Sequence, residues 1–98
     1  MGSKKAVIIE QSQSIAQEIS SVLSARDYTV LRASNGLDGI ELICEETPDL
    51  ILLNPAVTDI NGLCIYKLLK DDPRTSDIPL LICITNEKQA FRSLGIKP

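Results

Sequence analysis

The chain has 98 residues, of which 44% are hydrophobic and 23% charged, and this is the composition of one globular domain. Ten Lys and Arg against 13 Asp and Glu give a net charge of −3 without any basic run, so we expect neither nucleic acid nor a membrane as a partner. No His is present, which excludes imidazole base catalysis, and no apolar stretch approaches the ~20 residues of a membrane span. We expect a cytoplasmic protein that is not an enzyme.

The first predicted strand and helix lie near the N-terminus. Residues 6–9 form an unbroken apolar run rich in β-branched side chains, which is typical of a central strand in a parallel sheet. Ser12 and Ser14 are candidate N-caps of a helix that reaches to about Arg26. The side chains predicted to form its buried face recur at helical spacing and are Ile15, Ile19, Val22 and Leu23.

A second strand and helix follow. Residues 29–33 alternate polar with apolar side chains, which predicts a strand with one wetter face at a sheet edge. Asn35 is placed to cap the next helix, and Pro48 forbids its continuation. The predicted buried face of this helix consists of Leu37, Ile40 and Cys44.

Residues 50–53 and 80–84 are two further unbroken apolar runs, and both predict buried strands. Between them, a turn-rich stretch from Asn54 to Gly62 leads into a third helix, which Asp72 and Pro73 close. Its predicted buried side chains are Leu63, Tyr66 and Leu69. Strands that alternate with helices form right-handed βαβ units, so the sequence predicts an α/β fold with a parallel sheet.

Three Cys are widely spaced in the chain. Cys44, Cys64 and Cys83 each lie within an apolar run, and their number is odd. We interpret them as buried thiols in a reducing cytoplasm and not as a disulfide or a metal site.

The candidate site lies at the carboxyl ends of the predicted strands. In open parallel α/β sheets the functional residues gather there, near the point where the strand order reverses. Glu10 and Gln11 follow the first strand, Asn54 follows the third and Thr85 follows the fourth.

Several segments together resemble the receiver domains of two-component response regulators. They are the apolar strand 7–9 followed by a polar pair, the segment 48–54, Asn61-Gly62 opening a helix, and the segment 72–79 before an apolar strand that ends in Thr85. The resemblance implies a flavodoxin-like, doubly wound parallel sheet with the strand order 2-1-3-4. It also implies a phosphorylation pocket of two acids after the first strand, a phosphate-accepting Asp after the third, Ser or Thr after the fourth and Lys-Pro after the fifth.

The pocket residues that the resemblance implies here are Glu10, Gln11, Asn54, Thr85 and Lys97. One acid of three therefore remains, whereas Mg²⁺ prefers charged oxygen ligands. An amide cannot form the acyl phosphate that a nucleophilic carboxylate forms. We therefore expect a degenerate pocket with no catalytic residue, no metal and no cofactor.

The pocket departs from the family's pattern at several positions. Lys97 follows Thr85 by 12 positions, which is short of the family's usual interval. Asn54 has two explanations, a natural relaxation of the pocket and an engineered replacement of Asp. Gln11 and Pro55 favour the natural relaxation, because they are further departures at the same place.

Thirteen residues follow Thr85, too few for a regular fifth strand and a final helix. We interpret residues 1–98 as a single truncated receiver-like domain, with those two elements missing or truncated, and either cut from a longer protein or naturally short. The strand 80–84 would then expose apolar surface, so we expect a homodimer through the C-terminal side of the sheet. The predicted contact residues are Ile82, Ile84, Leu94 and Ile96.

The function that we predict is phosphorylation-independent binding of a protein partner in signalling, by a pseudo-receiver. One alternative is a working receiver that accepts phosphate from a histidine kinase with Mg²⁺. The other is a small α/β domain that binds an anionic ligand at helix N-termini.

Overall fold

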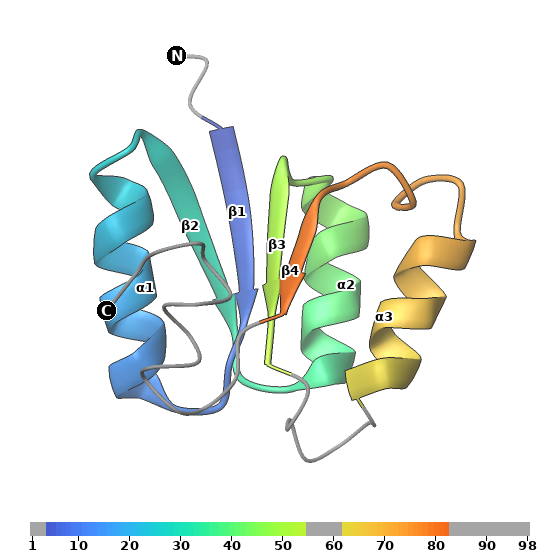
Figure 1. Ribbon diagram of the computed structural model, residues 1–98, viewed down its shortest axis with the longest axis horizontal. Coiled ribbons are helices and arrows are strands. Elements are labelled where there is room, and N and C mark those ends of the chain that lie inside the picture. Colours follow the sequence, from blue (N-terminus) through green and yellow to red (C-terminus); the bar gives the residue numbers. More distant parts are fainter. Residues whose placement is uncertain (1–3, 55–61, 83–98) are drawn as a thin grey trace.

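The computed structural model describes residues 4–54 and 62–82, and the side chains of all of these except 62 and 63. Its elements in chain order are β1 (Lys4–Ile9), α1 (Gln13–Ser24), β2 (Tyr28–Ala33), α2 (Gly36–Glu46), β3 (Leu50–Leu53), α3 (Gly62–Asp71) and β4 (Leu80–Ile82). The strands form one parallel sheet in the order β2-β1-β3-β4 (Figure 1). This confirms the predicted flavodoxin-like order 2-1-3-4, with the first strand inside the sheet and the second at an edge.

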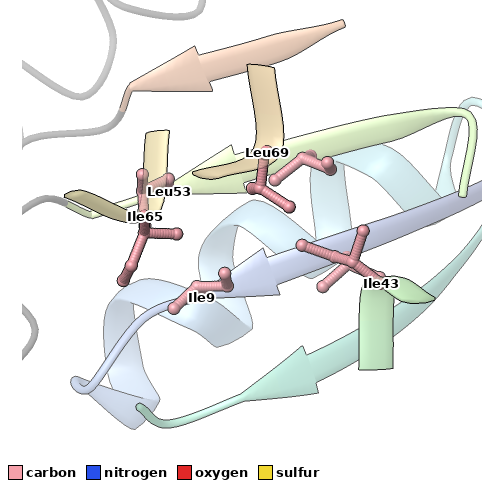
Figure 2. Packing of buried hydrophobic residues seen from close by; sticks show 7 residues of the cluster. Ile9, Ile43, Leu53, Ile65 and Leu69 are labelled. Carbon is pink, nitrogen blue, oxygen red and sulfur yellow. The ribbon is translucent and has the colours of Figure 1, made fainter. Parts of the chain in front are cut away.

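The sheet is covered on both faces, and the alternation of side chains along β1 and β3 decides what packs where. Ala6, Ile8 and Leu52 point toward α1 and form a cluster with its buried residues Ala16, Ile19 and Leu23. The other face of the sheet packs against α2 and α3. Figure 2 shows Ile9 and Leu53 of the sheet meeting Ile43 from α2 and the two α3 residues Ile65 and Leu69.

The first two helices begin at the predicted caps. The Ser12 hydroxyl accepts a hydrogen bond from the backbone N–H of Ile15 at 3.4 Å, and the Asn35 Oδ1 accepts one from the N–H of Asp38 at 2.9 Å. Both side chains satisfy donors that the first turn of a helix leaves free. No helix in the described part of the chain is long and apolar enough to cross a membrane.

The predicted buried faces of the helices are partly wrong. Leu37, Val22 and Tyr66 are 61%, 37% and 40% exposed, respectively. The buried residues of α2 are instead Gly36, Gly39 and Ile43, while the predicted Ile40 is partly buried against the same core. The helix lies so close to β1 that a residue without a side chain is needed at position 39, and the apolar pattern alone did not reveal this contact.

Two Cys side chains also differ from the prediction. Cys44 and Cys64 are exposed, free thiols. Cys83 lies outside the described residues. The prediction of buried thiols is therefore wrong for both of the Cys that the structure describes.

The last described strand is less covered than its sequence suggested. Leu80, Leu81 and Ile82 are all half-buried, although an apolar strand buried on both faces was predicted over residues 80–84. Residues 83 and 84 lie outside the described part, as do the positions of the expected missing fifth strand and final helix. Lys70 holds the loop between α3 and β4, since its Nζ donates to the carbonyl oxygens of Ser76 and Ile78 at 3.3 and 3.0 Å.

Candidate functional site

The candidate site lies where β1 and β3 end side by side. These two strands pair in parallel, with Ile9 opposite Leu53, so the next residue of each strand also lies next to its counterpart. The backbone N–H of Asn54 donates to the carbonyl oxygen of Ile9 at 2.9 Å. On the other side, the N–H of Glu10 donates to the carbonyl oxygen of Ala33 at 3.0 Å. The backbone therefore fixes Glu10 and Asn54 as neighbours.

The side chains of these two residues form a buried pair. Glu10 is 5% and Asn54 3% exposed. The Asn54 Nδ2 donates to both carboxylate oxygens of Glu10, at 3.0 Å to Oε1 and 3.1 Å to Oε2. A carboxylate only accepts hydrogen bonds, so the amide must present its nitrogen, and not its oxygen, to Glu10.

A third donor reaches the same carboxylate. The backbone N–H of Ser12 donates to Glu10 Oε2 at 2.9 Å, and Ser12 is the N-cap of α1. The positive end of the helix dipole therefore lies beside the carboxylate and stabilises its negative charge. Glu10 thus receives the hydrogen bonds that a buried carboxylate requires, without a Lys or Arg among the partners described here.

The other predicted pocket residues are not brought into this pair by the described structure. Gln11 is exposed, while its neighbour Glu10 is buried. Thr85 and Lys97 lie outside the described residues, and so do the predicted contact residues Ile84, Leu94 and Ile96. Sequence reasoning did not identify Ser12 as a residue of the site, because Ser12 contributes through its backbone N–H and not through its side chain. The only signal for it was the capping position two residues after Glu10.

The described residues do not fit the divalent cation that such a pocket binds in receiver domains with three acids. Within residues 4–54 and 62–82, no three His, Cys, Asp or Glu side chains gather at one point as metal ligands would. The Glu10 carboxylate already accepts three hydrogen bonds, and Asn54 turns a donor toward it. Nδ2 of Asn54 occupies the side from which a hard cation would be chelated by both carboxylate oxygens, so this arrangement does not fit one.

A separate hollow lies beside the edge strand β2 and is acidic. Its volume is about 330 Å³, and it is lined by Arg32, Ala33, Ser34, Asp38, Glu41, Leu42 and Glu45. Three carboxylates and one guanidinium give this hollow a net negative charge. It therefore offers little to an anionic ligand.

Comparison with known proteins identifies the family. The model of the response regulator receiver domain matches residues 6–97, which is most of the chain. The chain belongs to the response regulator receiver domain family.

Individual relatives agree with this assignment. The chain is 29% identical over 89 residues to protein PilH of Pseudomonas aeruginosa, covering 91% of this chain and 74% of PilH. It is 32% identical over 78 residues to the polar-differentiation response regulator DivK of Brucella anthropi, covering 80% of this chain and 63% of DivK. The chain thus spans less than the full length of both relatives.

Solved structures show the same fold. The chemotaxis response regulator CheY4 of Vibrio cholerae superposes with a TM-score of 0.79 at 22% identity, over 95% of this chain and 81% of that one. The phosphorylated cyanobacterial phytochrome response regulator RcpA superposes with a TM-score of 0.75 at 23% identity, over 94% and 74% of the two chains.

Proposed function

We propose that residues 1–98 form a single receiver-like domain that acts in the cytoplasm as a pseudo-receiver, binding a protein partner in signalling without being phosphorylated and without enzymatic activity. The degenerate pocket comprises Glu10, Gln11, Asn54, Thr85 and Lys97. The domain keeps the receiver fold and lacks the chemistry of phosphotransfer.

The observation that supports this proposal best is the amide of Asn54 at the carboxyl end of β3, held against Glu10. An amide oxygen carries no full negative charge and does not form an acyl phosphate. The neighbouring acid does not replace it as a nucleophile, since its oxygens accept three hydrogen bonds inside the protein. Both features remove phosphotransfer and leave the surfaces of the fold intact for binding.

Intact-mass measurement tests the proposal directly. The protein is incubated with a small phosphodonor and Mg²⁺, and we expect its mass to stay unchanged. RcpA, which has been crystallised in a phosphorylated form, is treated in parallel as the positive control. A stoichiometric, base-labile gain of one phosphoryl group by this chain would instead establish the working receiver.

A double variant shows what the pocket lacks. Restoring both acids by Asn54→Asp together with Gln11→Asp supplies the charged oxygens that Mg²⁺ prefers. We expect this variant to bind Mg²⁺ more readily than it accepts phosphate, because phosphoryl transfer needs further placed groups besides the metal. The single variant Gln11→Asp is the matched control, and we expect it to gain neither property.

We further propose that the domain forms a homodimer through the C-terminal side of the sheet, with Ile82, Ile84, Leu94 and Ile96 in the contact. The half-buried, fully apolar strand β4 supports this proposal. Light scattering at micromolar concentration should give a dimer, and Ile82→Lys should weaken it. Leu68→Lys, at a 55% exposed position of α3, is the control that should leave the dimer unchanged. A folded monomer at every concentration would contradict the dimer.

A further inference from the structure

We infer that the side-chain amide of Asn54 takes the place of a divalent cation between the ends of β1 and β3, and that this makes the stability of the folded domain independent of such cations. The inference rests on the proposed function only in treating the same pocket as one that does not accept phosphate. It assigns Asn54 a structural role.

The position of the amide nitrogen supports this role. Nδ2 lies almost equally far from the two Glu10 oxygens, at 3.0 and 3.1 Å, and so on the side where both oxygens present their lone pairs. A cation chelated by this carboxylate would approach along the same line and at a shorter distance. The nitrogen and the cation therefore cannot occupy the pocket together.

The amide also stabilises the negative charge of Glu10, as a bound cation would. A buried carboxylate next to a second strand end needs positive charge or donors around it. Here the donors are the amide of Asn54 and the N–H of Ser12 at the start of α1. Through Glu10, they join the ends of two strands to the first turn of a helix. No metal ion is needed to hold these three segments together.

A single exchange should reverse this arrangement. Asn54→Asp replaces the donor by a second carboxylate of the same shape, placed within hydrogen-bond distance of Glu10. Two buried carboxylates at this distance repel each other, and a divalent cation between them would remove the repulsion. Position 54 therefore decides whether a divalent cation changes the stability of the folded state.

The experiment compares thermal unfolding of the wild type and Asn54→Asp in EDTA and in millimolar Mg²⁺ or Mn²⁺. We expect the wild-type midpoint to be the same in all three solutions. The variant should unfold at a lower temperature than the wild type in EDTA, and Mn²⁺ should raise its midpoint, because a ligand that binds only the folded state stabilises it. Equal wild-type and variant midpoints in EDTA, or a wild-type midpoint that rises with either cation, would overturn the inference.

The chain offers a matched control. Asn35 Nδ2 donates to Asp38 Oδ2 at 2.9 Å, which is a second amide–carboxylate pair, but an exposed one. Asn35→Asp should change the midpoint little and create no dependence on Mn²⁺, because water screens the two charges and Asp is also a good N-cap.

A second variant covers the case in which Asn54→Asp does not fold. The double exchange Glu10→Gln with Asn54→Asp swaps the amide and the carboxylate and keeps one donor facing one acceptor. We expect it to fold with a midpoint that Mn²⁺ does not change, and a requirement for Mn²⁺ would overturn the inference. Phosphoryl incorporation in the mass measurement would contradict the proposed function without affecting these cation results.

Discussion

Gly39 of α2 lies directly against the side chain of Ile9 in β1, so closely that a Cβ atom at position 39 would be 2.6 Å from Ile9 Cγ1. Ile9 is fully buried within the core cluster between the sheet and α2. The distance between α2 and the sheet is therefore set by a residue without a side chain.

Gly39→Ala should lower the free energy of unfolding by about 1–2 kcal/mol, because overpacking exceeds the gain in helix propensity. Chemical denaturation monitored by circular dichroism measures the change. Ile9→Val removes the Cδ1 atom, so the double variant should be less destabilised than the two single variants added together. Strict additivity would show that Gly39 and Ile9 are not in contact. Glu41→Ala, at an exposed position of the same helix, should change stability by less than about 0.5 kcal/mol.

Thr47→Gly should stabilise the protein by about 0.5–1 kcal/mol. Thr47 is the C-cap of α2 and has φ 42°, in the left-handed region that a β-branched residue adopts at a cost. Gly adopts this conformation freely. The control is Thr29→Gly, at an exposed position of β2 with ordinary backbone geometry, which should destabilise the protein. A loss of stability in Thr47→Gly comparable to that of the control would contradict this reading.

Two thiols should react quickly in the native protein. Cys44 and Cys64 are exposed, so a thiol reagent such as Ellman's reagent reaches them without unfolding. Cys44→Ser and Cys64→Ser should each remove one equivalent of the fast reaction. Reaction of both thiols only after denaturation would show that Cys44 and Cys64 are buried, contrary to the structure.

Asp72 should titrate below its ordinary pKa of 3.8. The side chain of Arg74, whose Nη2 lies 2.8 Å from Asp72 Oδ2, and then its backbone N–H lower the pKa of this carboxyl. The contribution of the pair to stability is therefore present above the ordinary pKa and is lost as the pH falls through the lowered one. An NMR titration of Asp72 measures the midpoint.

The variant Arg74→Gln separates the two causes of the lowered Asp72 pKa. It should raise this pKa toward 3.8 but not completely, since the backbone N–H still donates. Arg26→Gln, at an exposed position elsewhere, should leave the titration unchanged. A midpoint that Arg74→Gln does not move would mean that the ion pair does not form in solution.

Much of the fold could be predicted from local patterns. The β-branched runs locate β1 and β3 because both faces of these strands are buried, and Ser12 and Asn35 locate helix starts because a cap depends on nearby backbone alone. The rotation of each helix about its own axis depends on the side chains of the sheet against which it packs. For that reason Leu37 and Cys44 were assigned to the buried face, which in the structure belongs to Gly39 and Ile43.

The position of the candidate site could be predicted from the sequence, but its hydrogen bonds could not. The rule that strand ends meet at one edge placed Glu10 beside Asn54, and the structure confirms that they are neighbours. The direction of the amide and the part of the Ser12 backbone depend on burial and on three-dimensional closeness, which residue types do not reveal. Thr75 shows the same limit. It lies in a turn that looks solvated, yet it is 2% exposed and its hydroxyl donates to the carbonyl oxygen of Leu69.

The mutual dependence of Glu10 and Asn54 also constrains how a lineage carrying them can change. Replacing Asn54 by Asp first sets two buried carboxylates against each other, and replacing Glu10 first by an apolar residue leaves the amide and the Ser12 N–H without their acceptor. Both of these single steps therefore pass through a less stable intermediate, and only the first can be relieved by a divalent cation. Reversion to a phosphate-accepting pocket would therefore need a divalent cation, paired mutations or a prior gain of stability elsewhere.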